Sequence, residues 1–367
     1  MHVIQVISPQ GGPGRHALEI CGGLAKLGVD RQTLILSDRP YRSFLDSLPS
    51  SVSVRVLSQG NPPISRMESM FRLLGDANAD VVHVHYPSMA LPLWLRGLTS
   101  KLVCTLHGHP QVMIEPKLWM KIGYLGELLS LKLIAQNVPL VSVSEFTSRN
   151  VRKIAGKPSR VVYPGIDVSV FTPPPNKTSA KQKLGFDRQF IVLYVGRIHP
   201  YKDPMTLVRA MAALPRDLSK LIIVGEGPIL PQVQKGLEKF NINYDHVPRL
   251  KVTDLVGYYQ AADVFVLPSI GEAAGIVIIE AMSCGLPVIS TNVGGPPEIV
   301  GNAGLYFSPG NARQLADKLT LVMGDESLRR NLSEMGRRRV EAMFSNLTMA
   351  SNYLEIYQRI LDENIPT

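Results

Sequence analysis

Short apolar runs rich in β-branched residues alternate with helical patterns along this sequence, and that alternation restricts the fold more than any other feature. In the first half the runs cover residues 3–7, 33–36, 81–84, 102–106 and 140–143, with helical spacing between them, as in residues 16–27. A second set covers residues 191–195, 221–224, 264–267 and 288–290. Strands that alternate with helices form parallel sheets with helices on both faces. The sequence therefore predicts an α/β fold with two doubly wound parallel-sheet domains, which suits 367 residues.

The predicted boundary lies near residue 170. Residues 171–180 are rich in proline and polar side chains, which favours a linker. Near the C-terminus, residues 343–361 carry apolar side chains at helical spacing and predict an amphipathic helix: Met349, Tyr353, Ile356, Tyr357 and Ile360. The predicted parts are residues 1–170, 171–345 and a C-terminal helix over 346–367.

Composition bounds the class of protein. The chain is 45% hydrophobic and 19% charged, which is a globular profile. Its three cysteines are far apart, so neither a disulfide framework nor a zinc ribbon is indicated. We see no signal peptide and no apolar run of about 20 residues. These features predict a cytoplasmic protein with buried thiols.

The formal net charge of +9 favours anionic partners, such as nucleotides or phospholipid headgroups, without choosing among them. The densest basic run, Arg337 to Arg339, is expected on a solvated helix face. Residues 116–136 form a helical pattern with leucines on one side and lysines elsewhere. We expect the leucine side to face the core; the alternative is a helix that lies on an anionic membrane.

Ligands of open α/β sheets bind beyond the carboxyl ends of the strands, so a ligand site is expected in the loops that follow the strands. After the first strand, Gly12, Gly14 and Ala17 match a dinucleotide-binding fingerprint, with Asp38 near the position of a ribose-binding carboxylate. The glycines would let backbone amides approach an anion at a helix N-terminus. A tight turn without a ligand explains the same residues.

Two further loops combine charges. After the predicted strand over residues 191–195 come Arg197, whose guanidinium can contact two phosphate oxygens, and Lys202, a compact positive charge; together they suit a diphosphate. Taken alone, these two residues are equally explained as solvated loop charges. Glu272 follows the strand over 264–267, and Glu280 falls among apolar residues of the next helix. A carboxylate in such surroundings needs hydrogen-bond donors, which sugar hydroxyls or a structural ion pair would supply.

Two His-x-His pairs, His83 with His85 and His107 with His109, also follow predicted strands. Such pairs occur in zinc sites and suggest a metal-dependent hydrolase as one alternative. No companion carboxylate stands at an obvious ligand spacing, so we expect one histidine to act and the others to be structural. The dinucleotide fingerprint supplies a second alternative, an NAD-dependent oxidoreductase, and a non-catalytic nucleotide-sugar binder is a third.

Over essentially its whole length the sequence resembles glycosyltransferase family 4. The resemblance rests on these motifs: Gly11-Gly12, residues 143–146, residues 163–167 with 171–173, Gly196-Arg197 with Lys202, residues 225–228, residues 262–269, and Glu272 with Glu280. The family implies a GT-B fold, with two Rossmann-like domains. It further implies a retaining transfer of a hexose from a UDP- or GDP-sugar to a glycan or lipid-linked acceptor. No metal, other cofactor or nucleic acid is implied, whereas peripheral contact with an anionic inner membrane face is compatible with it.

The resemblance also assigns roles to residues. It implies that Glu272 and His107 face the transferred sugar and act in catalysis. The implied donor-binding residues are Arg197 and Lys202 on the diphosphate, Glu280 on the ribose, Leu250 near the base, and Gly12, Gly275 and Ile276. Two positions depart from the family: Ala273-Ala274 replace Gly-Phe, and Asn346 replaces a tryptophan.

Overall fold

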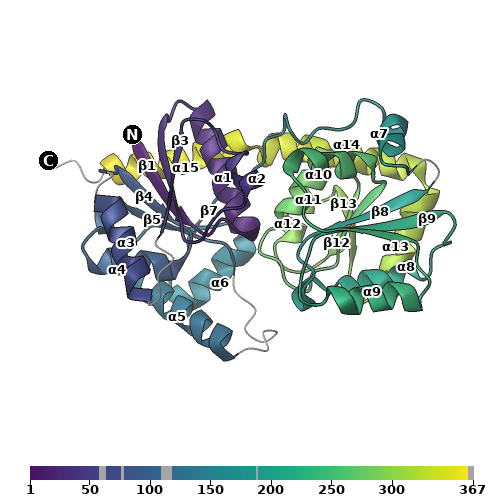
Figure 1. The fold of residues 1–367 in the computed structure, drawn as a ribbon, viewed down its shortest axis with the longest axis horizontal. Helices are drawn as coiled ribbons and strands as arrows, with labels where there is room; N and C mark the ends of the chain where they lie inside the picture. The colour runs from purple at the N-terminus through teal and green to yellow at the C-terminus, as the bar shows by residue number, and fades with distance from the viewer. Residues whose placement is uncertain (58–62, 76–77, 109–117, 187–188, 363–367) are drawn as a thin grey trace. The chain divides into compact units, whose positions relative to one another are not determined.

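In the computed structural model, residues 1–57, 63–75, 78–108, 118–186 and 189–362 are described. The chain forms two compact units (Figure 1). Unit 1 comprises Met1–Asp167 and Ser345–Thr367, and unit 2 comprises Val168–Phe344. The chain therefore leaves unit 1 once and returns to it once.

Unit 1 is built on a parallel sheet of seven strands within its described residues, in the order β3-β2-β1-β4-β5-β6-β7. The strands are β1 (His2–Ile7), β2 (Arg31–Leu36), β3 (Val52–Val56), β4 (Val81–Val84), β5 (Leu102–Leu106), β6 (Leu140–Ser142) and β7 (Arg160–Val161). The helices are α1 (Gly11–Lys26), α2 (Arg42–Leu45), α3 (Pro63–Gly75), α4 (Pro87–Leu95), α5 (Leu118–Ile134), α6 (Glu145–Ala155) and α15 (Asn346–Asp362), with a 3-10 turn η1 (Thr99–Lys101). All five strands predicted for the first half are confirmed.

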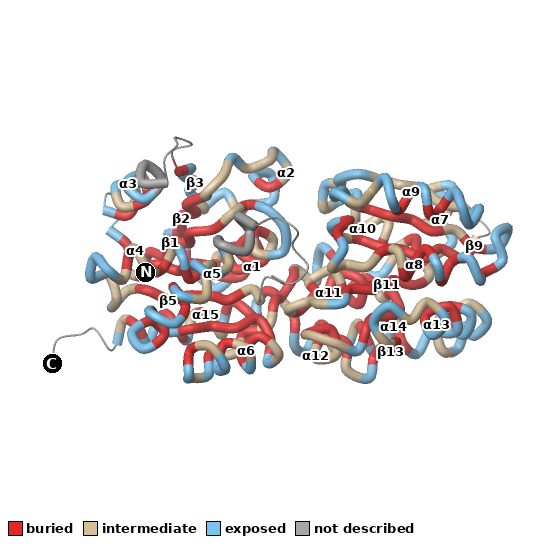
Figure 2. The backbone as a smooth tube through the Cα atoms, turned by 90° about the horizontal axis from the view of Figure 1, so that it is seen from below, coloured by how far each residue is buried: buried red, intermediate tan, exposed pale blue. Residues whose placement is uncertain are grey.

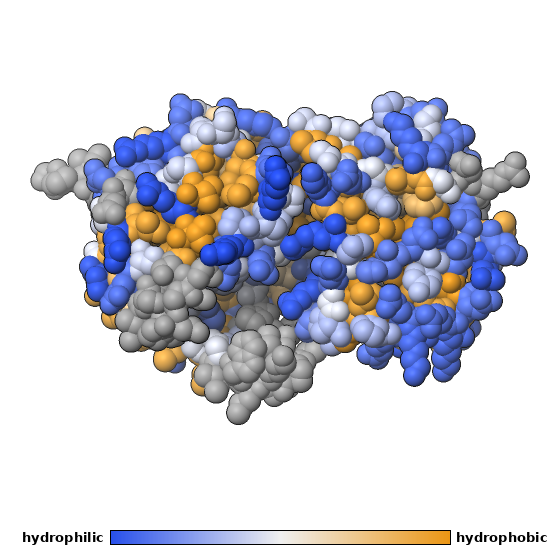
Figure 3. Space-filling model, viewed as in Figure 1, coloured by the Kyte–Doolittle hydropathy of each residue, from blue (hydrophilic) through white to orange (hydrophobic). Residues whose placement is uncertain are grey.

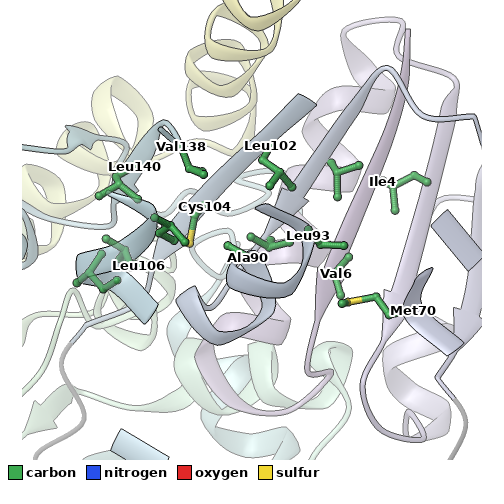
Figure 4. Close-up of a cluster of buried hydrophobic side chains, with 14 of the residues drawn as sticks. Ile4, Val6, Met70, Ala90, Leu93, Leu102, Cys104, Leu106, Val138 and Leu140 are labelled. Carbon is green, nitrogen blue, oxygen red and sulfur yellow. The ribbon is translucent and has the colours of Figure 1, made fainter. Parts of the chain in front are cut away.

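The centre of this sheet is buried on both faces, because helices cover each side (Figure 2). One face packs Ile4 and Val6 of β1 and Cys104 of β5 against Leu93 of α4 and Met70 of α3 (Figure 4). The opposite face packs against α1 and α15, where the five predicted apolar residues of the C-terminal helix are buried. The predicted amphipathic helix is thus confirmed.

Unit 2 repeats the plan with a parallel sheet that has six strands among the residues described, in the order β10-β9-β8-β11-β12-β13. The strands are β8 (Phe190–Val195), β9 (Ser219–Val224), β10 (Tyr244–Val247), β11 (Val264–Leu267), β12 (Val288–Thr291) and β13 (Gly304–Phe307). The helices are α7 (Lys177–Lys183), α8 (Pro204–Met211), α9 (Leu230–Lys239), α10 (Val252–Ala261), α11 (Ile276–Ser283), α12 (Pro296–Val300), α13 (Ala312–Gly324) and α14 (Glu326–Met343), with a 3-10 turn η2 (Pro200–Lys202). The predicted α/β class, with two doubly wound parallel sheets, is confirmed.

The strand order reverses once in each sheet, between β1 and β4 in unit 1 and between β8 and β11 in unit 2. At such a switch point the two connections leave in opposite directions and open a crevice at the carboxyl ends of the strands. The loops after β1, β4, β8 and β11 are therefore the places where each unit is built to hold a ligand.

The two crossings between the units are anchored on both sides. In unit 1, Ile166 pairs with Ser345, and the Asn346 amide donates to the Ile166 carbonyl at 2.8 Å. In unit 2, Phe171 is fully buried and its carbonyl accepts from Ser283 Oγ at 2.6 Å. Within the predicted linker over residues 171–180, Phe171 is thus anchored in unit 2 and α7 begins at Lys177, whereas Pro173, Pro175 and Asn176 between them are exposed.

The basic run of α14 also departs from the prediction. The guanidinium of Arg337 donates to the backbone carbonyls of Phe171, Ser283 and Val168 at 2.7–3.2 Å. That of Arg339 donates to the carbonyls at positions 298 and 299. Of the three arginines, only Arg338 is solvated. The other two are engaged because backbone carbonyls at the ends of neighbouring elements need hydrogen-bond donors.

Helix α5 differs from the expected core-facing orientation. Leu125, Leu129 and Leu133 are 65%, 57% and 44% exposed, whereas Leu131 and Ile134 are buried. The side chains of Leu118, Trp119 and Ile122 fall outside the description. No helix in the described ranges has the length and apolarity required to span a membrane.

Candidate donor and acceptor sites

Lys202 and Glu272 meet at the switch point of unit 2. Because β8 pairs with β11, the loops that follow these strands are neighbours. Lys202 ends η2 after β8, Glu272 follows β11, and the lysine ammonium donates to Glu272 Oε2 across 70 residues of sequence. The side chains are 12% and 17% exposed. The structure thus pairs two predicted site residues, and a bound diphosphate would compete with the carboxylate for the lysine.

Arg197 lies in the same loop and is exposed. Its backbone carbonyl is held by the Tyr194 hydroxyl at 2.9 Å, which fixes the main chain from which the side chain extends. No hydrogen bond or ion pair of its guanidinium occurs among the residues described. A planar cation on a fixed main chain suits a phosphate ligand, because it can present two parallel N–H groups.

Glu280 lies inside α11 and is 4% exposed. Its Oε2 accepts a hydrogen bond of 2.9 Å from the hydroxyl of Tyr259, a fully buried residue of α10. Tyr259 in turn contacts Phe171 and Phe265 edge to face or tilted. A neutral donor therefore orients this carboxylate, and nothing in the spacing of Tyr259 and Glu280 marked the tyrosine as its partner.

The N-terminus of α11 begins at the same loop. Gly275 is its N-cap residue, with φ of +89°, a conformation that favours glycine, and no side chain in the described structure caps the helix. The first amides of such a helix lack intrahelical acceptors and carry the positive end of the helix dipole. Gly275 and Ile276 therefore offer backbone N–H groups to an anion beside Glu272.

Backbone packs directly on backbone beneath these side chains. A Cβ on Gly227 would collide with the Ile198 carbonyl, and one on Gly295 with the Ala273 carbonyl. The Gly295 amide also donates to the Glu272 carbonyl at 2.9 Å. The loops after β8 and β9, and those after β11 and β12, are therefore in direct backbone contact, which leaves no room for added side-chain atoms at these glycines.

Leu250 lies farther along this edge of the sheet. It is half-buried in the connection between β10 and α10. His246, on β10, donates from Nε2 to the Gly225 carbonyl at 2.8 Å, which ties β10 to the glycine turn after β9. The residue is thus separated from the β8–β11 switch point by strand β9.

The glycine pattern predicted that Gly12 lies in a loop before the first helix of unit 1. In the structure it lies in the first turn of α1. It is exposed, with no heavy atom within 4 Å of its Cβ position, so the helix N-terminus is open there. Gly14 is different, because its Cβ would lie 2.6 Å from the Pro9 carbonyl. Close packing alone explains this second glycine of the fingerprint, and Asp38 accepts hydrogen bonds from Ser8 and Ser37.

The histidines at the β4–β5 edge form a hydrogen-bonded cluster. His85 Nδ1 lies 2.8 Å from His107 Nε2, and His85 Nε2 lies 3.0 Å from Gln5 Oε1. His83 contacts the Tyr357 hydroxyl and Thr105 Oγ1, each at 2.7 Å. His107 is half-buried at the end of β5, whereas His83 and His85 are buried. His109 lies outside the described residues.

Burial lowers the pKa of His83, His85 and His107 well below the usual value, and that of His16 to about 3. These imidazoles are therefore neutral near pH 7. Their nitrogens bond to one another and to protein groups, and no group of three or more His, Cys, Asp or Glu that could hold a metal occurs in the described part. Cys21, Cys104 and Cys284 are buried and unbridged.

Comparison with known proteins agrees with the fold and the motifs. Residues 10–170 match the model of Glycosyltransferase Family 4, and residues 176–339 match that of Glycosyl transferases group 1. A GDP-mannose-dependent monoacylated alpha-(1-6)-phosphatidylinositol monomannoside mannosyltransferase of Corynebacterium glutamicum is 30% identical over 275 residues, 71% of this chain and 70% of the relative. The chain belongs to glycosyltransferase family 4. These matches support neither the oxidoreductase nor the hydrolase interpretation.

Other relatives of this glycosyltransferase carry related names. An N-acetyl-alpha-D-glucosaminyl L-malate synthase of Bacillus anthracis is 29% identical over 301 residues, 78% of this chain and 76% of the relative. Among solved structures, sucrose-phosphate synthase of Thermosynechococcus elongatus has a TM-score of 0.85 at 23% identity, covering 99% of this chain and all of that one. Anabaena HepE, in complex with UDP and glucose, has a TM-score of 0.81 at 18% identity, covering 98% and 99%. The structural likeness establishes the GT-B fold.

Proposed function

We propose that this glycosyltransferase moves a hexose from a UDP- or GDP-sugar to a hydroxyl of a glycan or lipid-linked acceptor, with retention of configuration and without a metal ion. The observation that carries the proposal is the meeting of Lys202 and Glu272 at the switch point of unit 2, beside the open N-terminus of α11. A cation, a carboxylate and free amides at one point suit a ligand that joins a diphosphate to a sugar. One relative is named as GDP-mannose-dependent, and one structural neighbour was solved in complex with UDP and glucose, which supports the two donor classes.

Each group has a defined part in the proposed reaction. The C1–O bond to the diphosphate breaks while a C1–O bond to the acceptor hydroxyl forms on the same face, and the acceptor proton passes to a diphosphate oxygen. Arg197, Lys202 and the α11 amides neutralise the charge that grows on the leaving diphosphate, so they stabilise the transition state more than the ground state. In unit 2, Glu280 accepts hydrogen bonds from the ribose and Glu272 contacts the transferred sugar. In unit 1, His107 contacts a sugar hydroxyl.

Calorimetric titration of UDP, GDP, ADP and NAD, with and without EDTA, tests this proposal. The wild-type chain should bind UDP or GDP in EDTA, and the Glu280→Gln variant should bind it about tenfold more weakly, since a charged hydrogen-bond acceptor is lost. Glu334→Gln, at an exposed position of α14, is the matched control and should bind like wild type. Binding of NAD alone, or nucleotide binding that requires a metal and ignores Glu280, would refute the proposal.

We further propose that α5 brings this enzyme to an anionic membrane, where a lipid-linked acceptor would lie. The exposed leucines at positions 125, 129 and 133 recur every fourth residue and lie on one face, beside exposed Lys132. Exposed apolar side chains also occur elsewhere on the surface (Figure 3). What distinguishes α5 is that its exposed leucines recur on one face of a single helix.

Co-sedimentation with vesicles of phosphatidylglycerol and phosphatidylcholine tests the role of α5. The double variant Leu125→Ser, Leu129→Ser should lose most of its binding, because two apolar side chains no longer enter the lipid. Leu321→Ser, an exposed leucine of α13 in unit 2, is the control and should bind as wild type does. Equal sedimentation of both variants would rule out the proposed surface.

A further inference from the structure

A line of buried polar groups leads to His107 from the interior of unit 1. Gln5 of β1 donates from Nε2 to Cys21 Sγ at 3.1 Å, and its Oε1 lies 3.0 Å from His85 Nε2. His85 Nδ1 then lies 2.8 Å from His107 Nε2. The Gln5 and His85 side chains are 2% and 1% exposed, and only His107 at the end of the line is half-buried. This chain of hydrogen bonds therefore runs from the buried interior of unit 1 to the carboxyl edge of its sheet.

The amide of Gln5 gives this line a direction. Its NH2 group faces Cys21, so its oxygen faces His85 and can only accept. His85 must then carry its proton on Nε2, and a neutral imidazole has only one. Its Nδ1 can only accept, so the proton between the two histidines belongs to His107 Nε2. The remaining nitrogen of His107, Nδ1, is left as a lone-pair acceptor.

A second buried network lies beside the first and shares no hydrogen bond with it in the described part of the chain. His83 joins Tyr357 and Thr105, and Thr105 joins Tyr353, which contacts His16 at 3.0 Å. The rings of His83 and His85 stack with centroids 4.2 Å apart, yet their hydrogen bonds go to different partners. This second network provides a neighbour of equal burial that should not affect the tautomer of His107.

We infer that Gln5 and His85 are positioning residues that hold His107 as the neutral Nε2–H tautomer, so that its Nδ1 accepts a hydrogen bond from a sugar hydroxyl. The functional half of this inference rests on the proposed transferase function; the tautomer itself does not. An acceptor nitrogen selects a hydroxyl group, which can donate, and disfavours a carbonyl or phosphate oxygen, which cannot. His107 would thus contribute to the choice of the group that it faces.

Long-range 1H–15N correlation spectra of the 15N-histidine-labelled chain at pH 7.5 test the tautomer. The His107 signals, assigned from their loss in a His107→Gln variant, should show a protonated Nε2 and an unprotonated Nδ1. A Gln5→Met variant keeps the length of the side chain without the acceptor and should lose this preference. Gln5→Glu should retain it, because a carboxylate oxygen accepts from His85 as the amide does. Tyr357→Phe, in the second network, should leave it unchanged.

Two results would overturn the inference: a protonated Nδ1 of His107 in the wild-type chain, or an unchanged tautomer in Gln5→Met. If Gln5→Met does not fold, the wild-type spectrum still shows which of the two histidines donates.

Turnover of UDP-glucose, UDP-N-acetylglucosamine and GDP-mannose supplies a separate readout. With the donor that reacts, Gln5→Met should lose about tenfold in kcat/KM, the loss of one aligned hydrogen bond, and Gln5→Glu should recover most of it. Absence of turnover in the wild-type chain would count against the transferase proposal and leave the tautomer result standing.

Discussion

Lys202 illustrates how a site residue is held before its ligand arrives. Its ammonium group is engaged by Glu272 in a mostly buried pair, so the charge is both positioned and partly neutralised. An incoming diphosphate would meet a lysine already paired and a carboxylate that repels it. Glu272 therefore opposes binding of the nucleotide product even though it is proposed to assist transfer of the sugar.

We accordingly expect Glu272→Gln to bind UDP or GDP about three- to tenfold more tightly than wild type and to transfer sugar more slowly. Removal of the carboxylate releases Lys202 and removes a repulsive charge, an effect of about 1 kcal/mol for a pair of this exposure. Calorimetric titration measures the dissociation constant, with Glu334→Gln as the exposed control. Weaker nucleotide binding by Glu272→Gln would contradict this account.

A second prediction at the scale of single residues concerns adjacent arginines. Arg337→Lys should destabilise unit 2 by about 2 kcal/mol, because the single nitrogen of a lysine cannot occupy the two positions from which the guanidinium donates to three backbone carbonyls. Arg338→Lys, one residue along and paired only with Glu334 on the surface, should change the free energy of unfolding by less than about 0.5 kcal/mol. Scanning calorimetry of both variants gives the comparison, and equal stability would show that the carbonyl contacts contribute little.

These residues also mark what the sequence can and cannot disclose about a site. Residue type and position after a strand single out Glu272 and Lys202 as candidates, and the structure pairs their side chains because strand ends converge at a switch point. The partner of Glu280 was not predictable, because Tyr259 reaches it from another helix and no spacing rule links the two. The role of Arg337 was missed because its acceptors are backbone groups, which leave no mark on the sequence.

At the scale of elements, strands were recognised when both faces are buried and missed when they are not. The fully buried strands β1, β4, β8 and β11 have continuous apolar runs. β10 and β13, at the two edges of their sheet, are only half-buried and mix polar or small residues with apolar ones. An edge strand needs less apolar sequence than a central one.

Replacement of Gly227 tests the close backbone packing of the loops beneath the proposed donor site. Gly227→Ala should destabilise unit 2 by more than about 3 kcal/mol or prevent its folding, because the added Cβ meets the Ile198 carbonyl, which cannot move without shifting the Arg197 loop. Gly257→Ala, within α10 with open space at its Cβ, should stabilise the unit by up to about 1 kcal/mol. Calorimetry compares the two; a Gly227→Ala variant of wild-type stability would show that the loops yield easily.

At the scale of the whole molecule, the buried imidazoles of unit 1 couple its stability to pH. Since the pKa of His16 is about 3 in the folded unit and about 6.5 when unfolded, the unfolded chain binds the proton first as pH falls. The free energy of unfolding therefore decreases from about pH 6.5 downwards, by about 1.4 kcal/mol per pH unit for each such histidine. Glu19 and Glu127, whose pKa values burial raises, act in the opposite direction.

Urea unfolding followed by tryptophan fluorescence isolates this effect, because both tryptophans, Trp94 and Trp119, belong to unit 1. The unfolding midpoint should fall between pH 7 and pH 4.5. In a His16→Gln variant, which has one fewer imidazole to protonate, the fall should be shallower. A midpoint independent of pH, or an equal slope in the variant, would show that these imidazoles are already protonated or exposed.

The return of α15 to unit 1 has a consequence for synthesis of the chain. Unit 2 is continuous in sequence, so the ribosome delivers all of it before the helix that seals the earlier unit. Until residues 346–362 emerge, the nascent sheet of unit 1 lacks the surface that covers it, and His16 and His83 lack their phenol partners. During this interval unit 2 can complete its core while the sheet of unit 1 still exposes apolar surface. Exposed apolar surface favours aggregation and chaperone binding. Unit 1 can therefore bury this face of its sheet only after α15 has been translated.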